Sequence, residues 1–292
     1  MTKTKVRKAV FPAAGFGTRF LPATKAIPKE MLPLVDKPVI QYGVEEAIAA
    51  GCDQIVIVTG RGKSAIEDHF DVSFELETML EKRGKKELLA VSRNVSNMVR
   101  LSYVRQKEAM GLGHAVLMAR DLVGDEPFAV ILPDDVIDAK VPCLKQMVDL
   151  HEKLQGSILA THEIEGPAIS AYGVLDGSPV KDHPRVMDVK GLVEKPKPEE
   201  APSKHAIIGR YILTPEIFEV LERTPLGVGG ELQLTDGIKG LLKKEKVYGY
   251  NFEGRRYDAG DKLGLMTATI DFALKRDDLG PQLKEHIQSL GL

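Results

Sequence analysis

The chain carries, at residues 13–33, the stretch AAGFGTRFLPATKAIPKEMLP, directly after the apolar run KAVFP at residues 8–12. The apolar run predicts a buried strand. The three prolines within the longer stretch oppose a continuous helix there. A loop of this length without regular structure is uncommon and is usually functional. We therefore expect the stretch to be a functional loop at the end of the first strand.

The residue types in this loop suit a phosphate-bearing ligand. Gly15 and Gly17 allow the backbone to approach a ligand closely, and successive N–H groups can form a nest for anions. Arg19 can hold a phosphate with two hydrogen bonds, whereas Lys29 supplies a point charge. The loop is predicted to wrap a polyphosphate.

The composition excludes several other classes of protein. The chain has 292 residues, 40 Lys and Arg against 42 Asp and Glu, and a net charge of −2. It has neither a global basic field nor a basic patch with interleaved aromatics, so no nucleic acid is expected as a partner. No apolar run is long enough for a bilayer, and the N-terminus lacks the apolar core of a signal peptide. The two cysteines, Cys52 and Cys143, suit reduced thiols. We expect a cytoplasmic protein without a membrane partner.

The order of apolar runs predicts an α/β fold. Predicted strands and helices alternate at residues 8–12, 39–50, 54–59, 63–70, 99–105, 110–123 and 128–132, where 110–123 is a glycine-hinged turn that leads into a helix. Such alternation indicates a parallel sheet, and continuous apolar strands indicate a sheet covered on both faces. The fold class is therefore α/β, with a doubly wound, mostly parallel nucleotide-binding sheet and a smaller β-rich portion.

Residues 1–292 are predicted to form a single domain with three distinct parts. The charged segment 71–98 predicts a helical insertion. Residues 165–261 are rich in predicted strands, and residues 262–276 form an amphipathic C-terminal helix.

Three phosphate-binding motifs compete for the loop. The P-loop is excluded, because no Gly-Lys-Ser/Thr follows the glycines. The dinucleotide fingerprint is not matched either, because it needs a small residue at the position of Phe20. The third, GxGTRxxPxTxxxPKxxLP, resembles the signature of the sugar nucleotidyltransferases. Further segments of that family follow in order, namely DD at 134–135, YGV at 172–174, VEKP at 193–196, GELQLTD at 230–236 and YDAGD at 257–261.

This resemblance implies a set of nucleotide contacts. Arg19 and Lys29 are expected to clamp the triphosphate, and Gln106 with Gly111 to read a pyrimidine. Glu30 could bond the ribose or pair with Lys29. The residues expected at the nucleotide are Ala13, Ala14, Gly15, Gly17, Thr18, Glu30, Gln106 and Gly111.

A magnesium site is expected from two carboxylates. Asp134 follows a buried strand and Asp258 follows another, and Mg2+ favours a few carboxylates together with phosphate oxygens and water. Asp261 is the alternative to Asp258, and it could instead cap the last helix. No pair of histidines has zinc spacing.

The β-rich portion is expected to hold the sugar phosphate. By resemblance, Glu194 binds sugar hydroxyls and Lys195 neutralises phosphate charge. The expected sugar contacts are Asp135, Gly173, Glu194, Ile207 and Gly209. Arg19, Lys29 and Lys195 would then be the catalytic cations for an in-line attack of the sugar phosphate on the α-phosphorus.

The fuller string KAIPKEMLP and Asp135 resemble the branch of the family that uses UTP and glucose 1-phosphate and makes UDP-glucose with Mg2+. One alternative is a thymidylyl or other sugar-1-phosphate nucleotidyltransferase. Another is a non-catalytic regulatory paralogue, against which the intact Gly17-Thr18-Arg19 argues. The resemblance also suggests a homodimer or homotetramer.

Overall fold

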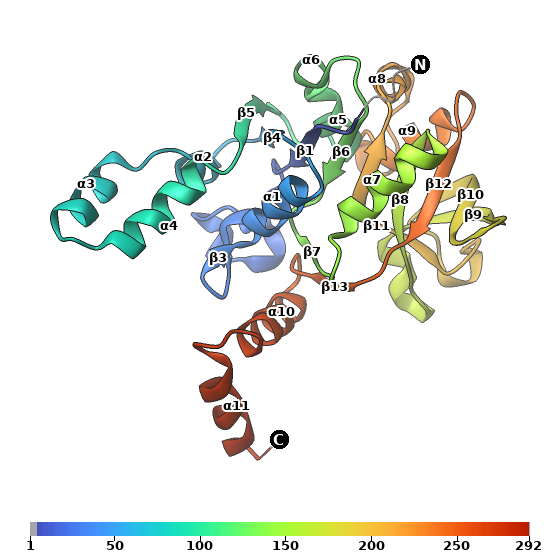
Figure 1. Cartoon of the computed structure of the whole chain (residues 1–292). Helices are drawn as coiled ribbons and strands as arrows, with labels where there is room; N and C mark the ends of the chain where they lie inside the picture. Colours follow the sequence, from blue (N-terminus) through green and yellow to red (C-terminus); the bar gives the residue numbers. More distant parts are fainter. Residues whose placement is uncertain (1–4, 292) are drawn as a thin grey trace.

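The computed structural model describes residues 5–291, and within them one nine-stranded sheet carries helices on both faces (Figure 1). The strand order is β5-β4-β1-β6-β11-β8-β12-β10-β9. The predicted α/β class is confirmed. The β-rich portion is not a separate sheet, because its strands continue the sheet that begins with the nucleotide-binding half.

The first half of the sheet is parallel. Its strands are β5 (Arg100–Arg105), β4 (Gln54–Thr59), β1 (Lys8–Pro12) and β6 (Phe128–Ile131). All three pairings between these neighbours are parallel. The connecting helices are α1 (Val39–Ala49), α2 (Ser64–Phe70), α5 (Leu112–Met118) and α6 (Arg120–Val123). The carboxyl ends of these strands therefore lie together at one edge of the sheet.

The second half adds antiparallel pairings. Its strands are β11 (His205–Leu213), β8 (Ser157–Glu163), β12 (Val247–Asn251), β10 (His183–Glu194) and β9 (Gly173–Val180). β11 pairs antiparallel with both β6 and β8, whereas β12 pairs parallel with β8. Within this sheet only β10 and β11 run against β1, but each of them pairs antiparallel with both neighbours, so the parallel half continues into a mixed half.

Two cores lie on opposite faces of the sheet. Along β1, Ala9 and Phe11 point to one face and Val10 to the other, as the two-residue repeat of a strand requires. The first face is covered by α1, α2 and α7 (Cys143–Leu154). The second is covered by α5, α8 (Glu216–Arg223) and α9 (Leu234–Leu241). Burial on both faces explains why the central strands are continuously apolar.

Two helical pairs extend from the body (Figure 1). Segment 71–98 contains α3 (Phe74–Lys82) and α4 (Lys86–Ser96), beyond the edge strand β5. At the C-terminus, α10 (Lys262–Leu274) is followed by α11 (Gly280–Ser289), which the sequence interpretation did not include. No helix of residues 5–291 has the length and apolarity needed to cross a membrane.

Two small ladders complete the fold. β2 (Pro33–Leu34) pairs with β3 (Lys37–Pro38), and β7 (Asp135–Asp138) pairs with β13 (Arg255–Asp258). A third apolar cluster, with Leu34, Val136, Tyr257 and Ala268 among its members, joins both ladders to α10. This cluster fixes the late segment 255–261 against the turn that follows β6.

Candidate active site

The loop at residues 13–33 begins at the end of β1 and folds back on itself. It contains three single-turn 3-10 helices, at Thr18–Phe20, Ala23–Lys25 and Lys29–Met31. Gly17 has a φ of 67°, and a Cβ there would lie 2.9 Å from Cβ of Lys29. Only glycine suits this point, because the backbone is left-handed and the Lys29 stem packs directly against it. The close packing brings Lys29 over the end of the sheet.

Asp134 and Asp258 converge at the carboxyl end of β6. The β7–β13 ladder pairs Asp135 with Asp258, and the Ala259 amide donates to the Asp134 carbonyl at 2.8 Å. A Cβ built on Gly260 would lie 2.9 Å from both Oδ2 of Asp134 and Oδ1 of Asp258. The two carboxylates therefore border one small space that only a glycine leaves open.

This space fits a magnesium ion by the chemistry of its donors. Across the described residues, no cluster of three or more His, Cys, Asp or Glu side chains could hold a metal. Two carboxylates with substrate oxygens and water are nevertheless a usual set for Mg2+. Asp258 and Asp261, the two alternatives for the second carboxylate, make different contacts in the fold. Asp261 caps α10, since its Oδ1 accepts the Gly264 amide at 2.9 Å.

Two cations of the loop meet these carboxylates. Nζ of Lys29 lies 2.5 Å from Oδ2 of Asp134, and Nη1 of Arg19 donates to the Gly260 carbonyl at 3.3 Å. Burial disfavours charge on Asp134, but the attraction and hydrogen bond of Lys29 outweigh it and lower the pKa of Asp134. For Lys29, burial is likewise outweighed by Asp134 and the pKa is raised. Both groups are held in their charged forms.

Asp135 is bonded within the protein. Its Oδ1 accepts from Nε of Arg256 at 2.5 Å, and its Oδ2 accepts from the Gly209 amide at 2.9 Å. Burial raises the pKa of Asp135, and the charge of Arg256 opposes that rise. Arg256 also donates to the Tyr172 hydroxyl at 2.8 Å and lies 3.3 Å from Oδ2 of Asp258. Arg256 was not among the site residues predicted from the sequence. The sequence contained one indication of its role: Arg256 precedes Asp258 by two residues, and this spacing puts both side chains on the same face of a strand.

The sugar-side candidates surround Glu194 at the end of β10. Oε2 of Glu194 accepts a 2.6 Å hydrogen bond from Thr235, and Nζ of Lys195 lies 3.6 Å from Oε1. A Cβ on Gly173 would lie 3.2 Å from Oε2 of Glu194, so a side chain there would crowd the carboxylate. The Lys195 side chain is 57% exposed. Thr235 lies in the GELQLTD segment but had not been singled out.

The predicted metal and sugar residues, together with Arg19, line one cavity of about 230 Å3, whereas Lys29 and Lys195 are not part of its wall. The predicted residues on its wall are Arg19, Asp134, Asp135, Gly173, Glu194, Ile207, Gly209 and Asp258. Tyr172, Thr235 and Arg256 line it as well. Residues from the first loop, the β6 turn, β10, β11 and β13 thus meet in one place, although they are far apart in the sequence.

The predicted base-reading residues lie beside the same edge of the sheet. The Gln106 amide nitrogen donates to the Gly111 carbonyl at 3.2 Å and lies 2.8 Å from Nδ1 of His114. Gly111 has a φ of 98°, and a Cβ there would lie 2.8 Å from the Leu232 carbonyl oxygen. The backbone of Gln106 bonds the end of β4 at Thr59. The amide nitrogen of Gln106 is therefore used within the protein, where it fixes the orientation of the side chain.

Glu30 departs from its expected place. Its side chain is buried, and the partner of its Oε2 is Nζ of Lys63 at 2.7 Å rather than Lys29. Burial raises the pKa of Glu30, and Lys63 opposes the rise. Glu30 ties the loop to the segment before α2 and does not line the 230 Å3 cavity. The sequence could not reveal this, because Lys63 is brought close only by the fold.

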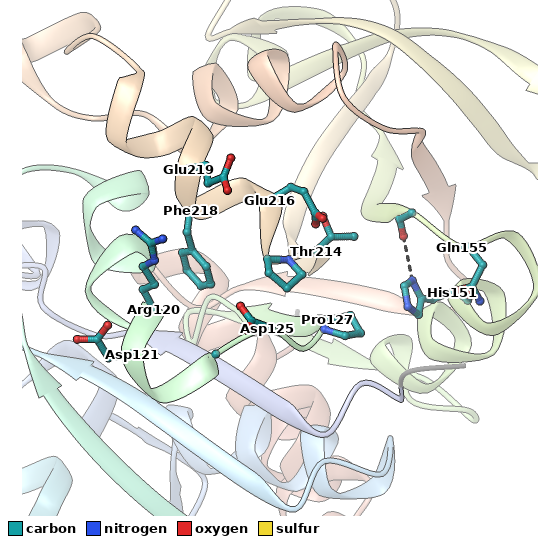
Figure 2. A pocket seen from close by; sticks show the side chains of 13 residues that line it. Arg120, Asp121, Asp125, Pro127, His151, Gln155, Thr214, Glu216, Phe218 and Glu219 are labelled. Carbon is teal, nitrogen blue, oxygen red and sulfur yellow. Dashed lines mark hydrogen bonds between the residues drawn. The ribbon is translucent and has the colours of Figure 1, made fainter. Parts of the chain in front are cut away.

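A larger cavity of about 780 Å3 lies at the opposite end of the sheet (Figure 2). Its walls include Pro127 just before β6, Gly156 just before β8 and Thr214 just after β11. None of the predicted site residues lines it. Figure 2 shows acidic side chains such as Asp125, Glu216 and Glu219 around an open hollow. The smaller cavity is therefore favoured as the candidate site, because the predicted charged residues line it and because ligands of such sheets bind at the carboxyl ends of the strands.

The chain is similar to known proteins over most of its length. The family model described as nucleotidyl transferase matches residues 8–273. The UTP--glucose-1-phosphate uridylyltransferase of Bacillus subtilis (strain 168) is 53% identical over 286 residues, covering 98% of this chain and 97% of the relative. A crystal structure of UDP-glucose pyrophosphorylase complexed with UDP-glucose has a TM-score of 0.85 and 48% identity, covering 93% of this chain and 100% of that one.

A further solved structure, UTP-bound UGPase from Acinetobacter baumannii, has a TM-score of 0.91 and 40% identity, covering 98% of this chain and 99% of that one. The resemblance first seen in the loop signature is thus confirmed over almost the whole chain. Since the family model and the relatives each span nearly all of it, the chain belongs to the nucleotidyl transferase family.

Proposed function

We propose that this protein makes UDP-glucose and pyrophosphate from UTP and glucose 1-phosphate. The observation that carries the proposal is the 230 Å3 cavity, where the phosphate loop meets two carboxylates and the Glu194 side of the sheet. The relatives named for this reaction cover nearly the full chain. The sugar-binding part corresponds to about residues 165–261.

The reaction needs positioning and neutralisation of charge more than it needs a general base. The phosphate of glucose 1-phosphate is anionic at neutral pH and can attack the α-phosphorus of UTP directly. Arg19 and Lys29 neutralise the triphosphate, and Lys195 neutralises the attacking phosphate. Glu194 orients the sugar through its hydroxyls, and Gln106 with Gly111 faces the pyrimidine. Lys29 exchanges part of its contact with Asp134 for contact with the nucleotide.

Asp134 and Asp258 would hold Mg2+ in the space beside Gly260. When bound there, Mg2+ supplies neutralisation of phosphate charge. The supporting observation is that both carboxylate oxygens lie 2.9 Å from the position of a Gly260 Cβ.

The first experiment measures pyrophosphate release and UDP-glucose formation from UTP and glucose 1-phosphate, with parallel assays on dTTP, ATP and CTP. UTP is expected to be the best substrate, and EDTA is expected to abolish turnover. Faster release with dTTP would replace the uridylyl assignment by a thymidylyl one. No release with any nucleotide, from folded protein, would favour a regulatory paralogue.

The Gly260→Ala variant tests the magnesium proposal. The added methyl enters the space between Asp134 and Asp258, without strain from a left-handed backbone. The Mg2+ concentration for half-maximal activity is expected to rise about tenfold, as for a slightly misplaced ligand set. The matched control is Gly51→Ala; it lies far from the site, and a Cβ there meets nothing within 4 Å, although its φ of 102° costs some stability. An unchanged Mg2+ requirement in Gly260→Ala would argue against this placement of the ion.

We also propose a homodimer or homotetramer in the cytoplasm. Along α10, the apolar residues Leu263, Met266 and Ile270 are 74%, 62% and 41% exposed at helical spacing. A second copy of the chain would cover this stripe, and light scattering of the purified protein tests the oligomer. A cytoplasmic location agrees with UTP as substrate and with the buried, free thiols of Cys52 and Cys143. Cell fractionation tests it.

A further inference from the structure

Arg210 on β11 is a buried cation that the proposed mechanism does not use. The residue is 1% exposed, and its guanidinium bonds in three directions. Nε and Nη2 donate to Glu46, the latter at 2.8 Å. Nη1 donates to the carbonyls of Leu132 and Gly209 at 3.2 and 3.0 Å, and Nη2 also donates to the Asp135 carbonyl at 2.7 Å. All five N–H groups of the side chain therefore have acceptors.

Two of those acceptors belong to the turn that carries Asp134. Arg210 binds the carbonyls at both ends of this turn, at Leu132 and at Asp135. Gly209 adds two more contacts: its carbonyl accepts the Leu132 amide at 2.8 Å, and its amide donates to Oδ2 of Asp135 at 2.9 Å. Hydrogen bonds from Arg210 and Gly209 thus hold the turn against β11, while the Asp134 side chain lines the cavity.

An irregularity in β11 makes this arrangement possible. On the β8 side, the register of β11 shifts between Ile207 and Tyr211, so residues 208–210 leave the regular ladder. A Cβ on Gly209 would lie 2.5 Å from Oδ2 of Asp135, so only glycine allows the approach. A bulge of this kind re-aims side chains next to functional sites.

Glu46 on α1 completes the arrangement. Its Oε1 accepts the Leu144 amide at 2.9 Å, in the first turn of α7. A carboxylate at a helix N-terminus is favourable, because it meets unpaired N–H groups and the positive end of the helix dipole. Glu46 thus fixes Arg210 to two helices of the first core, α1 and α7.

We propose that Arg210 and Glu46 are positioning residues for the transfer reaction: the pair holds the Leu132–Asp135 turn so that Asp134 faces Asp258 across Gly260. The inference rests on the proposed function. A buried ion pair is weak evidence of stabilisation, since apolar replacements are often as stable. Here the five donors of one planar group define the path of a turn, and lysine, with three donors, cannot reproduce them.

The test uses Arg210→Lys and Glu46→Asp, which keep both charges but change the reach of the side chains. In Arg210→Lys, kcat is expected to fall about tenfold to a hundredfold with little change in the KM of UTP, as for a misplaced catalytic group. Glu46→Asp is expected to have a smaller effect of the same kind, and it carries the test if Arg210→Lys does not fold. The control is Phe218→Leu, which loosens the core at the far end of the sheet and should leave kcat unchanged.

A double-mutant cycle with Asp134→Asn separates positioning from general damage. If Arg210 acts through Asp134, Arg210→Lys should lower kcat much less in the Asp134→Asn background than in the wild type. Equal losses in both backgrounds, or a kcat within twofold of wild type, would overturn the proposal.

A crystal structure of Arg210→Lys gives a readout that does not depend on the reaction. The Leu132–Asp135 turn is expected to shift relative to Gly260, and an unmoved turn contradicts the positioning role. If the wild type makes no UDP-glucose but the turn moves in the variant, the proposed function fails while the structural part of the inference stands.

Discussion

The two ends of the sheet differ in size and in chemistry. At the amino ends of β6 and β8, the cavity of about 780 Å3 is wide, and its carboxylates lie near solvent. At the carboxyl end of β6, the cavity of about 230 Å3 is smaller, but it gathers Arg19, Asp134, Glu194 and Arg256 from separate parts of the chain. Volume alone would select the first cavity. The second cavity is selected instead by its charged side chains, which meet there and are held by short hydrogen bonds. Burying charged groups together costs free energy, so such a cluster is typical of a functional site.

The largest loss is expected for Asp134→Asn. The substitution removes a charge that pairs with Lys29 at 2.5 Å and borders the Gly260 space. Turnover is expected to fall on the order of 10²–10³-fold, comparable with loss of a preorganised electrostatic group. Steady-state pyrophosphate release measures the effect, with thermal unfolding as the control for folding. A kcat within tenfold of wild type would remove Asp134 from the site.

Lys195→Ala should have the next largest effect. Lys195 is well exposed and its nearest ion-pair partner, Glu194, is 3.6 Å away, so its loss should not unfold the protein. We expect kcat to fall about a hundredfold with unchanged Tm, because the attacking phosphate loses its neutralising cation. Lys197→Ala, a nearby exposed lysine, is the matched control and should behave as wild type. Equal turnover in the two variants would contradict the role of Lys195.

Glu194→Gln tests the sugar side of the cavity. The amide can keep the 2.6 Å bond from Thr235 but loses the charge that strengthens bonds to sugar hydroxyls. The KM of glucose 1-phosphate is expected to rise about tenfold, which corresponds to the loss of one hydrogen bond to a charged group. The KM of UTP should not change. A rise in the KM of UTP instead would place Glu194 at the nucleotide.

The smallest effect is expected at the larger cavity. Asp125→Asn and Glu216→Gln change two of its acidic walls, away from every predicted site residue. Both kcat and KM are expected to stay within about twofold of wild type, as for ordinary surface substitutions. The same pyrophosphate assay measures them. A loss approaching that of Lys195→Ala would show that the comparison between the two ends of the sheet is incomplete.

The α/β class and the loop at residues 13–33 could both be predicted from local features of the sequence. Apolar runs without polar alternation required a sheet covered on both faces, and Val10 and Phe11 indeed enter opposite cores. The glycines, prolines and cations of residues 13–33 were sufficient to predict a phosphate loop. These features are local, so composition and spacing along the chain are enough to reveal them.

The pairing of polar groups, in contrast, became visible only in the folded chain. Asp261 proved to be a helix cap, whereas Asp258 faces Asp134. Glu30 is bonded to Lys63, and Arg210 reaches Glu46, 164 positions earlier in the chain. No local sequence pattern predicts such pairings. The sequence shows that a side chain is charged, but it does not show whether water or a distant residue forms its hydrogen bonds. Burial and hydrogen bonding, which separate the two cases, exist only after the sheet has formed.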